Sequence, residues 1–157
     1  MVSSDICIDC SEGGSVREGT IFGNTIQALP RQDGANIRFT GLAGNNEKIG
    51  LISVTGNHIS SQMVNIHLDH THGVSITGNT FIRGYDRNII IDKSLNVIIS
   101  ANLFDHNKDY VPGGISVSDC DSIILVNNII DGVEYKAGGA ITVNDSREVS
   151  LRGNHII

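Results

Sequence analysis

Apolar and polar residues alternate in short runs along most of the chain, and the runs recur at a regular spacing. Each run has the form apolar–x–apolar, where x is often polar, as in Ile66-His67-Leu68 and Val74-Ser75-Ile76. Alternation with a period of two residues is typical of a β-strand with one buried face. A second run begins eight residues after the first in four successive copies, which start at Ile66, Ile89, Ile115 and Ile141. The pattern therefore predicts repeated pairs of short strands.

An asparagine follows the second strand of each pair and marks the repeat. It occurs six times, at intervals of 33, 22, 23, 26 and 26 residues: Asn24, Asn57, Asn79, Asn102, Asn128 and Asn154. A period in this range indicates a solenoid of stacked coils. Asparagine tolerates left-handed backbone angles and its amide can bond the coils above and below, so we expect a structural ladder. An Ile or Phe after each Asn adds a third strand.

These elements define the expected fold. Three short strands in one coil cannot pair with one another across the turns, but each can pair with its equivalent in the next coil. We predict an all-β parallel β-helix of about six coils, with three short parallel sheets and an Asn ladder, as a single domain over residues 1–157. Inward side chains would form aliphatic columns, one of them Ile37, Ile66, Ile89, Ile115 and Ile141.

The repeat resembles that of the right-handed parallel β-helix superfamily of pectate lyases, polygalacturonases and other proteins with PbH1-type repeats. In that superfamily each coil has strands PB1, PB2 and PB3, with an Asn ladder between PB2 and PB3 and a loop, T3, from PB3 to the next PB1. The resemblance implies a right-handed, single-stranded coil and covers about residues 6–157. It makes residues 66–69 a PB1 strand and residues 74–76 a PB2 strand. It also implies a secreted or cell-surface protein, while the sequence itself leaves localisation open.

Composition narrows the function classes. Aromatic residues are 4% of the chain and Trp is absent, so the core must be aliphatic. A net charge of −6 argues against nucleic acid as a partner, and no apolar run is long enough for a membrane span. The three cysteines leave one unpaired, and Cys7 and Cys10 lack a second pair at metal-binding spacing. We therefore interpret them as small buried or surface thiols.

The outward positions of PB1 are the first candidate site. His67 and Asp69 point away from the core, and Asp92 shares the register position of Asp69 one coil further on. Stacking brings these carboxylates to about 5 Å of each other, where they repel unless a cation lies between them. Such a pair suits the acid and base of a glycoside hydrolase or the Ca²⁺ site of a polysaccharide lyase. The catalytic candidates are Asp69, Asp92, His67 and Lys93; the alternative is a solvated polar stripe with a Lys93 ion pair.

The T3 loops are the second candidate site. The register from PB1 to the Asn turn is constant, so we expect T3 to carry every length change, and variable polar loops on a rigid scaffold often bind ligands. The three tyrosines of the chain stand at nearly matching points in successive T3 loops, where their rings could stack on sugars beside basic residues. The substrate-binding candidates are Tyr85, Arg87, Lys108, Tyr110, Tyr135 and Lys136. Alternatively, each tyrosine ring packs on its own loop.

Metal and cofactor signals are weak. His67, His70 and His72 have a suggestive spacing, but strand geometry does not force them together. We predict no metal site and no cofactor, with Ca²⁺ at the Asp pair as the one option. His72-Gly73 resembles a polygalacturonase motif, but the Asn-Thr-Asp, adjacent Asp-Asp and Arg-Ile-Lys motifs of those enzymes are absent.

The expected function is carbohydrate-related. We predict a carbohydrate-active or carbohydrate-binding protein that takes acidic polysaccharide along the PB1–T3 face, and a lyase or glycoside hydrolase if it is an enzyme. The alternative is a non-catalytic structural or adhesion scaffold, because the catalytic signatures are missing. Either the chain is a fragment of a longer β-helix, or exposed helix ends and edges cause homo-oligomerisation.

Overall fold

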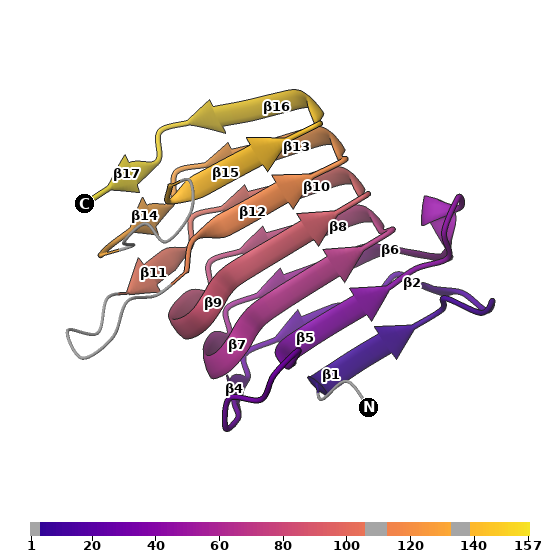
Figure 1. Cartoon of the computed structure of the whole chain (residues 1–157), viewed down its shortest axis with the longest axis horizontal. Helices are drawn as coiled ribbons and strands as arrows, with labels where there is room; N and C mark the ends of the chain where they lie inside the picture. The colour runs from indigo at the N-terminus through magenta and orange to yellow at the C-terminus, as the bar shows by residue number, and fades with distance from the viewer. Residues whose placement is uncertain (1–3, 106–112, 133–138) are drawn as a thin grey trace.

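The chain forms a solenoid of stacked coils. The computed structural model describes residues 4–105, 113–132 and 139–157. Figure 1 shows the strands lying in parallel rows, with the two termini at opposite ends of the stack. Within the described residues the ladders between named strands are parallel, from the β1–β5 pair to the β14–β17 pair. The predicted class, a right-handed parallel β-helix, is confirmed.

The strands follow the expected order PB1, PB2, PB3 in each coil. PB1 comprises β1 (Ser4–Asp9), β5 (Ala35–Thr40), the second parts of β7 (His58–Asp69) and β9 (Thr80–Asp92), β12 (Ile115–Ser118) and β15 (Ile141–Asn144). PB2 comprises β2 (Val16–Arg17), β3 (Thr20–Phe22), β6 (Ile49–Thr55), β8 (His72–Thr77), β10 (Leu95–Ser100), β13 (Asp121–Val126) and β16 (Arg147–Arg152). PB3 comprises β4 (Thr25–Gln27), the first parts of β7 and β9, β11 (Leu103–Asp105), β14 (Ile129–Ile130) and β17 (His155–Ile156).

The strands form two hydrogen-bonded sheets where three were expected. One sheet has 10 strands and joins PB3 to PB1, and the other has 7 strands and contains PB2. PB3 and PB1 belong to one sheet because β7 and β9 run through T3 without a break. Each bends there at a residue with left-handed backbone, Ser61 (φ 65°) or Arg83 (φ 57°), and the β7–β9 register shifts between Gln62 and Val64. These T3 segments are therefore bends within long strands.

Aliphatic side chains stack in the columns that the alternation predicted. Ile66 pairs in register with Ile37 on one side and with Ile89 on the other, and all three are fully buried. Phe81 and Phe104 stack in the PB3 column with ring centroids 4.8 Å apart. Stacked coils thus give the inner side chains apolar neighbours in the adjacent coils.

The Asn ladder is present and is structural. The Nδ2 of each Asn donates to Oδ1 of the next, at 2.8–3.0 Å through all five steps. The expectation that the Asn itself is left-handed is wrong by one residue. The left-handed angle belongs to the preceding residue: Gly23, Gly56, Gly78, Ala101, Asn127 and Gly153. This bend leaves the Asn side chain pointing along the stack.

Two further ladders reinforce the other corners of the coil. At the entry to PB1, Asn36 donates to Asn65 and Asn65 to Asn88, at 2.8 and 2.7 Å. In T1, the turn from PB1 to PB2, hydroxyl and thiol groups form a column of Thr71, Ser94, Cys120 and Ser146. Cys10 and Cys120 are buried free thiols and Cys7 is an exposed one. The cysteines are accordingly the buried or surface thiols expected.

The expectation that T3 carries every length change fails in the coil that contains β5 and β6. β5 ends at Thr40 and β6 begins at Ile49, so the T1 turn of that coil is an inserted loop with a short 3₁₀ helix, η1 (Asn46–Lys48). This loop has no apolar alternation, so the repeat pattern did not reveal it. The solenoid has about four turns, slightly fewer than the six coils expected.

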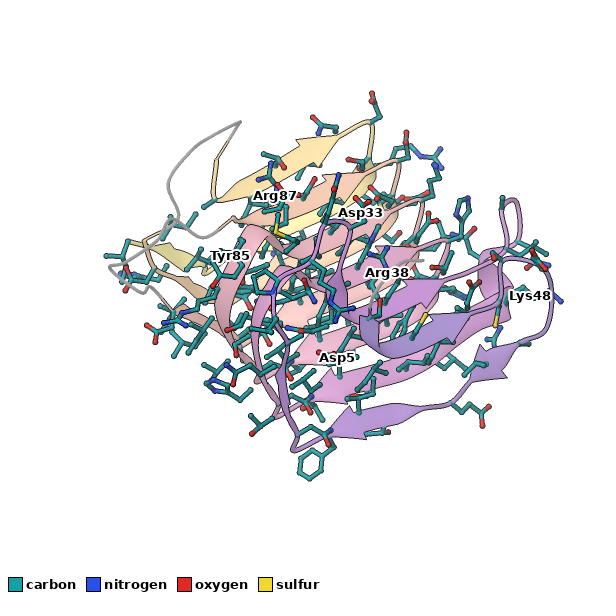
Figure 2. The ribbon with its side chains drawn as sticks, turned by 60° about the horizontal axis from the view of Figure 1, so that its bottom comes forward. Asp5, Asp33, Arg38, Lys48, Tyr85 and Arg87 are labelled. Carbon is teal, nitrogen blue, oxygen red and sulfur yellow. The ribbon has the colours of Figure 1, made fainter. Side chains whose placement is uncertain are left out.

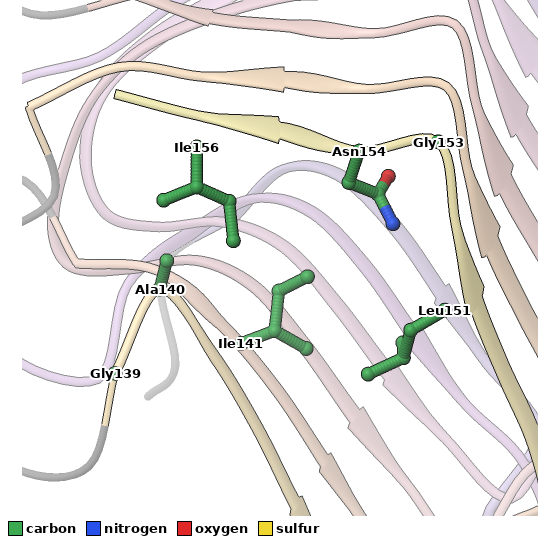
Figure 3. A pocket seen from close by; sticks show the side chains of 7 residues that line it. All are labelled: Gly139, Ala140, Ile141, Leu151, Gly153, Asn154 and Ile156. Atoms are coloured by element: carbon green, nitrogen blue, oxygen red, sulfur yellow. The ribbon is translucent and has the colours of Figure 1, made fainter.

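The last described coil leaves part of the aliphatic core uncovered. Leu151 and Ile156 are 49% and 54% exposed. Both line a pocket of about 430 Å³. Figure 3 shows its lining residues, Gly139, Ala140, Ile141, Leu151, Gly153, Asn154 and Ile156. Association through the helix ends stays a prediction.

Candidate functional site

Three neighbouring PB1 strands carry the polar residues of the candidate site. Strand register places Arg38 of β5 beside His67 of β7, and Asp69 of β7 beside Asp92 of β9. The inward neighbours of His67, Ile66 and Leu68, are fully buried, so alternation directs His67 outward. The register that was predicted for Asp69 and Asp92 is therefore present.

Arg38, His67 and Asp92 form a hydrogen-bonded chain across the three strands. Arg38 Nη1 lies 2.6 Å from His67 Nδ1, and His67 Nε2 lies 3.2 Å from Asp92 Oδ2. An arginine can only donate, so His67 Nδ1 must accept and carries no proton. The proton of the neutral ring is then on Nε2, where it can be donated to Asp92. The contact with Arg38 thus assigns the tautomer of His67.

A small pocket opens beside this chain. It has a volume of about 260 Å³ and is lined by Gln32, Asp33, Arg38, Met63, Val64, His67, Asp86 and Ile90. Figure 2 places Arg38 next to Asp33, and Arg38 Nη2 donates to the backbone carbonyl of Asp33 at 2.8 Å. Apolar side chains and a few polar groups together are typical of a small-ligand site. The pocket is smaller than most sites for drug-sized molecules, which suits a single small unit of a larger ligand.

Arg38 is partly buried, and its environment acts on its charge in two directions. Burial lowers the pKa of the guanidinium, because removal from water disfavours the charged form. Cys7, Asp33 and Asp69 act in the opposite direction and favour the charge. An arginine keeps its proton in either case. The side chain is therefore a fixed positive charge with reduced hydration.

The carboxylates of Asp69 and Asp92 have different partners. Asp69 Oδ1 lies 2.7 Å from His70 Nδ1, whereas Asp92 Oδ2 faces His67. Lys93 occupies the T1 turn with a left-handed backbone (φ 46°), and its side chain is exposed. The catalytic candidates thus lie close together on PB1 and T1, and each carboxylate has a histidine nitrogen beside it, although Asp69 Oδ1 makes no hydrogen bond within the described residues. Their catalytic role stays a prediction.

Only some of the predicted substrate-binding residues lie within the described structure. Tyr85 is 37% exposed on β9, and Arg87 follows it on the same strand, with Nη1 3.0 Å from the carbonyl of Asp86. Figure 2 shows both near the T3 bend of β9. Four candidates lie outside the described residues: Lys108, Tyr110, Tyr135 and Lys136. The tyrosine platform is therefore represented by one member.

Arg38 and Asp33 were missed by the sequence reasoning. The signal for Arg38 was available, because Ile37 belongs to a predicted inward column and alternation then directs the next residue, Arg38, outward. The register then puts Arg38 directly beside His67. Asp33 stands in a loop without periodicity, and no pattern in the sequence pointed to it.

A second polar cluster lies on the T1 side of the coil. Glu47 in η1 contacts Arg17 of β2, and its Oε1 lies 2.6 Å from Nδ1 of His72. Asn96 Nδ2 lies 2.8 Å from His72 Nε2. Arg17 lowers the pKa of Glu47, chiefly through its hydrogen bond to the carboxylate. The cluster joins the inserted loop to neighbouring coils and is a structural clamp.

A parallel solenoid with an Asn ladder and a polar PB1 face defines a right-handed β-helix protein of the PbH1 type. Within that class the chain belongs to the NosD family, described as periplasmic copper-binding protein, whose model matches residues 17–157. The description of the family agrees with the expected location outside the cytoplasm. No helix in the described part of the chain is long and apolar enough to cross a membrane.

The comparison with solved structures supports the fold. The chain is similar to the crystal structure of "a putative glycosyl hydrolase" from Parabacteroides merdae ATCC 43184, with a TM-score of 0.58 and 15% identity. The match covers 88% of this chain and 77% of that chain. Likeness at this identity concerns the architecture alone. A search of curated proteins found no match.

The family description corrects the expectation about cofactors. We expected none, with Ca²⁺ as the option, whereas the family is described as copper-binding. Copper sites use imidazole and sulfur donors gathered around one point. Among the described residues, no three His, Cys, Asp or Glu side chains are grouped so that they could hold a metal ion. The described coils therefore do not fit a copper centre.

The histidines illustrate why the described coils lack a copper centre. His67, His70 and His72 each face a different carboxylate, from Asp92, Asp69 and Glu47 respectively. Among the described residues they do not form part of a group of three donors that could hold a metal ion. We derive no chemical step through copper.

Proposed function

We propose that the chain binds a glycan along the PB1–T3 face, with the pocket beside Arg38 and His67 as its centre. The observation that carries the proposal is the pocket itself, which combines Met63 and Ile90 with charged and hydrogen-bonding groups. A sugar unit has an apolar C–H face and a rim of hydroxyls, so it needs both kinds of group. Tyr85 and Arg87 continue this surface toward T3.

We propose binding in preference to cleavage. Hydrolysis by two carboxylates requires one that donates a proton and one that attacks or activates water. Here Asp92 accepts from His67 and Asp69 lies against His70. Neither carboxylate stands alone beside the pocket. The likeness to a structure described as a glycosyl hydrolase is compatible with a glycan ligand but concerns the fold only.

Affinity electrophoresis against a panel of uronic and neutral polysaccharides tests the proposal. We expect at least one polysaccharide to retard the wild-type chain. His67→Ala and Arg87→Ala should each weaken that retardation about tenfold, a loss of about 1.4 kcal/mol. Arg147→Ala is the matched control, because its exposed side chain pairs with Asp121 on PB2, away from the pocket. Absence of retardation by every polysaccharide, or equal loss in the Arg147 variant, would refute the proposal.

A parallel assay separates binding from cleavage. The polysaccharides that bind are incubated with the wild-type chain and with Asp69→Ala and Asp92→Ala. Hydrolysis would release reducing ends, and a lyase would produce unsaturated uronates that absorb ultraviolet light. We expect neither product. Product formation that disappears in both Asp variants would restore the catalytic interpretation of these residues.

A further inference from the structure

The contact between Arg38 and His67 holds two basic groups against each other. Arg38 Nη1 lies 2.6 Å from His67 Nδ1, a short contact that places a donor directly against this ring nitrogen. The contact is favourable only while Nδ1 is unprotonated, because a doubly protonated ring would set a donor against a donor. The Arg38 contact therefore requires an unprotonated Nδ1, while Asp92 faces the other ring nitrogen.

Arg38 has donors left for a ligand. Within the described residues it uses three of its five N–H groups, toward His67, the carbonyl of Asp33 and Oγ of Ser4 at 3.4 Å. Its side chain also lines the 260 Å³ pocket. A guanidinium is matched in shape and charge to a carboxylate, and partial burial strengthens such a pair.

The other charged groups around the pocket restrict where a ligand carboxylate can bind. Asp33 and Asp86 line it, Asp92 faces His67 from β9, and Asp69 lies near Arg38. A carboxylate ligand near the aspartates is repelled, so it would be held only in contact with Arg38. The hydroxyls of the same sugar unit could donate hydrogen bonds to the carboxylates of Asp33 and Asp86. Arg38 is thus the group that distinguishes an acidic sugar from a neutral one.

We propose that Arg38 receives the carboxylate of a uronic-acid unit and that this contact releases Nδ1 of His67, which then takes up a proton. The proposal rests on the proposed glycan-binding function and adds the ligand class and a coupling. Once Arg38 turns to the ligand, His67 lies between Asp92 and the uronate. Two nearby carboxylates favour the charged imidazolium. Arg38 acts on His67 as a positioning residue, and ligand charge controls the proton.

The first experiment measures the coupling without any ligand. Nitrogen NMR of the histidine rings at pH 6.5 reports whether Nδ1 of His67 carries a proton. In the wild-type chain we expect an unprotonated Nδ1 and a protonated Nε2. Arg38→Met, which keeps the length of the side chain and removes its charge, should raise the Nδ1–H fraction at least twofold. An unchanged Nδ1 signal in this variant would overturn the coupling, provided that amide spectra show an intact fold.

The second experiment measures selectivity and proton uptake. Oligogalacturonate and its full methyl ester are titrated calorimetrically in two buffers with different ionisation enthalpies. We expect the acid to bind at least tenfold more tightly than the ester and to take up part of a proton. His67→Gln should keep the selectivity and lose the uptake, and Arg38→Met should lose the selectivity.

The outcomes separate this inference from the function on which it rests. Equal binding of acid and ester would overturn the role of Arg38 but leave glycan binding intact. Binding of the acid without proton uptake, or the same uptake in His67→Gln, would overturn the release of His67. Sodium acetate is titrated as well, and binding as tight as that of the oligosaccharide would show a simple anion site. If no polysaccharide binds in the electrophoretic panel, the proposed function itself fails.

Discussion

Asn79 is joined twice to Asn102, because its backbone N–H and its side-chain Nδ2 both donate to the same Oδ1, at 2.9 and 3.0 Å. Asn102 in turn donates from Nδ2 to the carbonyl of Ile76 and to Oδ1 of Asn128, each at 3.0 Å. One buried side chain therefore satisfies groups in three coils. Such a group costs about 1–3 kcal/mol when it is left without a partner.

Asn102→Ala should lower the free energy of unfolding by at least about 3 kcal/mol, since several buried groups lose their partners together. Chemical denaturation with urea measures the loss. Asn24→Ala is the control, because Asn24 is more exposed and stands at the first step of the ladder. It should cost clearly less. Equal losses in both variants would show that the ladder does not act through buried hydrogen bonds.

Gly41→Ala should destabilise the chain by about 3 kcal/mol or more, because the two coils approach each other closely at this turn. A Cβ at Gly41 would lie 2.0 Å from the carbonyl oxygen of His70, which is backbone and cannot move aside. Gly19→Ala is the matched control, with the side chain of Ile52 at 3.6 Å as its nearest neighbour. Thermal unfolding of the two variants compares them directly. Similar melting temperatures would contradict the observed spacing of the coils.

Cys7 should react with iodoacetamide much faster than Cys120. Cys7 is exposed, whereas Cys120 is 3% exposed within the T1 column. Burial raises the pKa of the Cys120 thiol, so little of the reactive thiolate is present at neutral pH. Mass spectrometry of labelled peptides at pH 8 should show modification of Cys120 only after urea is added. Labelling of Cys120 in the native Cys7→Ser variant would contradict its burial.

Acid should release the inserted T1 loop. Arg17 lowers the pKa of Glu47 in the folded state, so the contribution of Glu47 to stability is present above its unfolded pKa. That contribution disappears as the pH falls through the lower folded value. Hydrogen exchange of residues 41–48 should therefore accelerate below about pH 4 relative to the PB2 strands. In Glu47→Gln, which cannot titrate at this position, the exchange of these residues relative to the PB2 strands should not change over this range.

The sequence predicted the fold well because the solenoid repeats its information. Each inner column and each ladder contributes one residue per coil. An ambiguous strand assignment in one coil is therefore resolved by the equivalent positions in the neighbouring coils. The inserted loop with η1 was missed for the opposite reason, since it occurs once and follows no period. PB3 and PB1 merge into one sheet through left-handed backbone angles at Ser61 and Arg83. Neither Ser nor Arg favours such angles, so the sequence does not predict them.

The candidate site was predicted only in part. Register alone placed Asp69 beside Asp92, and the structure has that pairing. The partners of these carboxylates depend on side-chain directions in the turn and across strands, as with His70 and Arg38. Such directions are not fixed by strand alternation. The pocket also needs Asp33, which a loop of irregular sequence brings to PB1.

The ladder fixes where each coil lies without fixing how many residues the coil contains. Asn24 and Asn57 are 33 residues apart and Asn57 and Asn79 only 22, yet both side-chain bonds measure 3.0 Å. Additional residues are placed in surface loops, and the hydrogen bonds between the ladder amides keep the same length. An engineer could therefore lengthen or exchange a loop beside the PB1 face and alter what that face recognises, while the frame beneath it keeps its spacing.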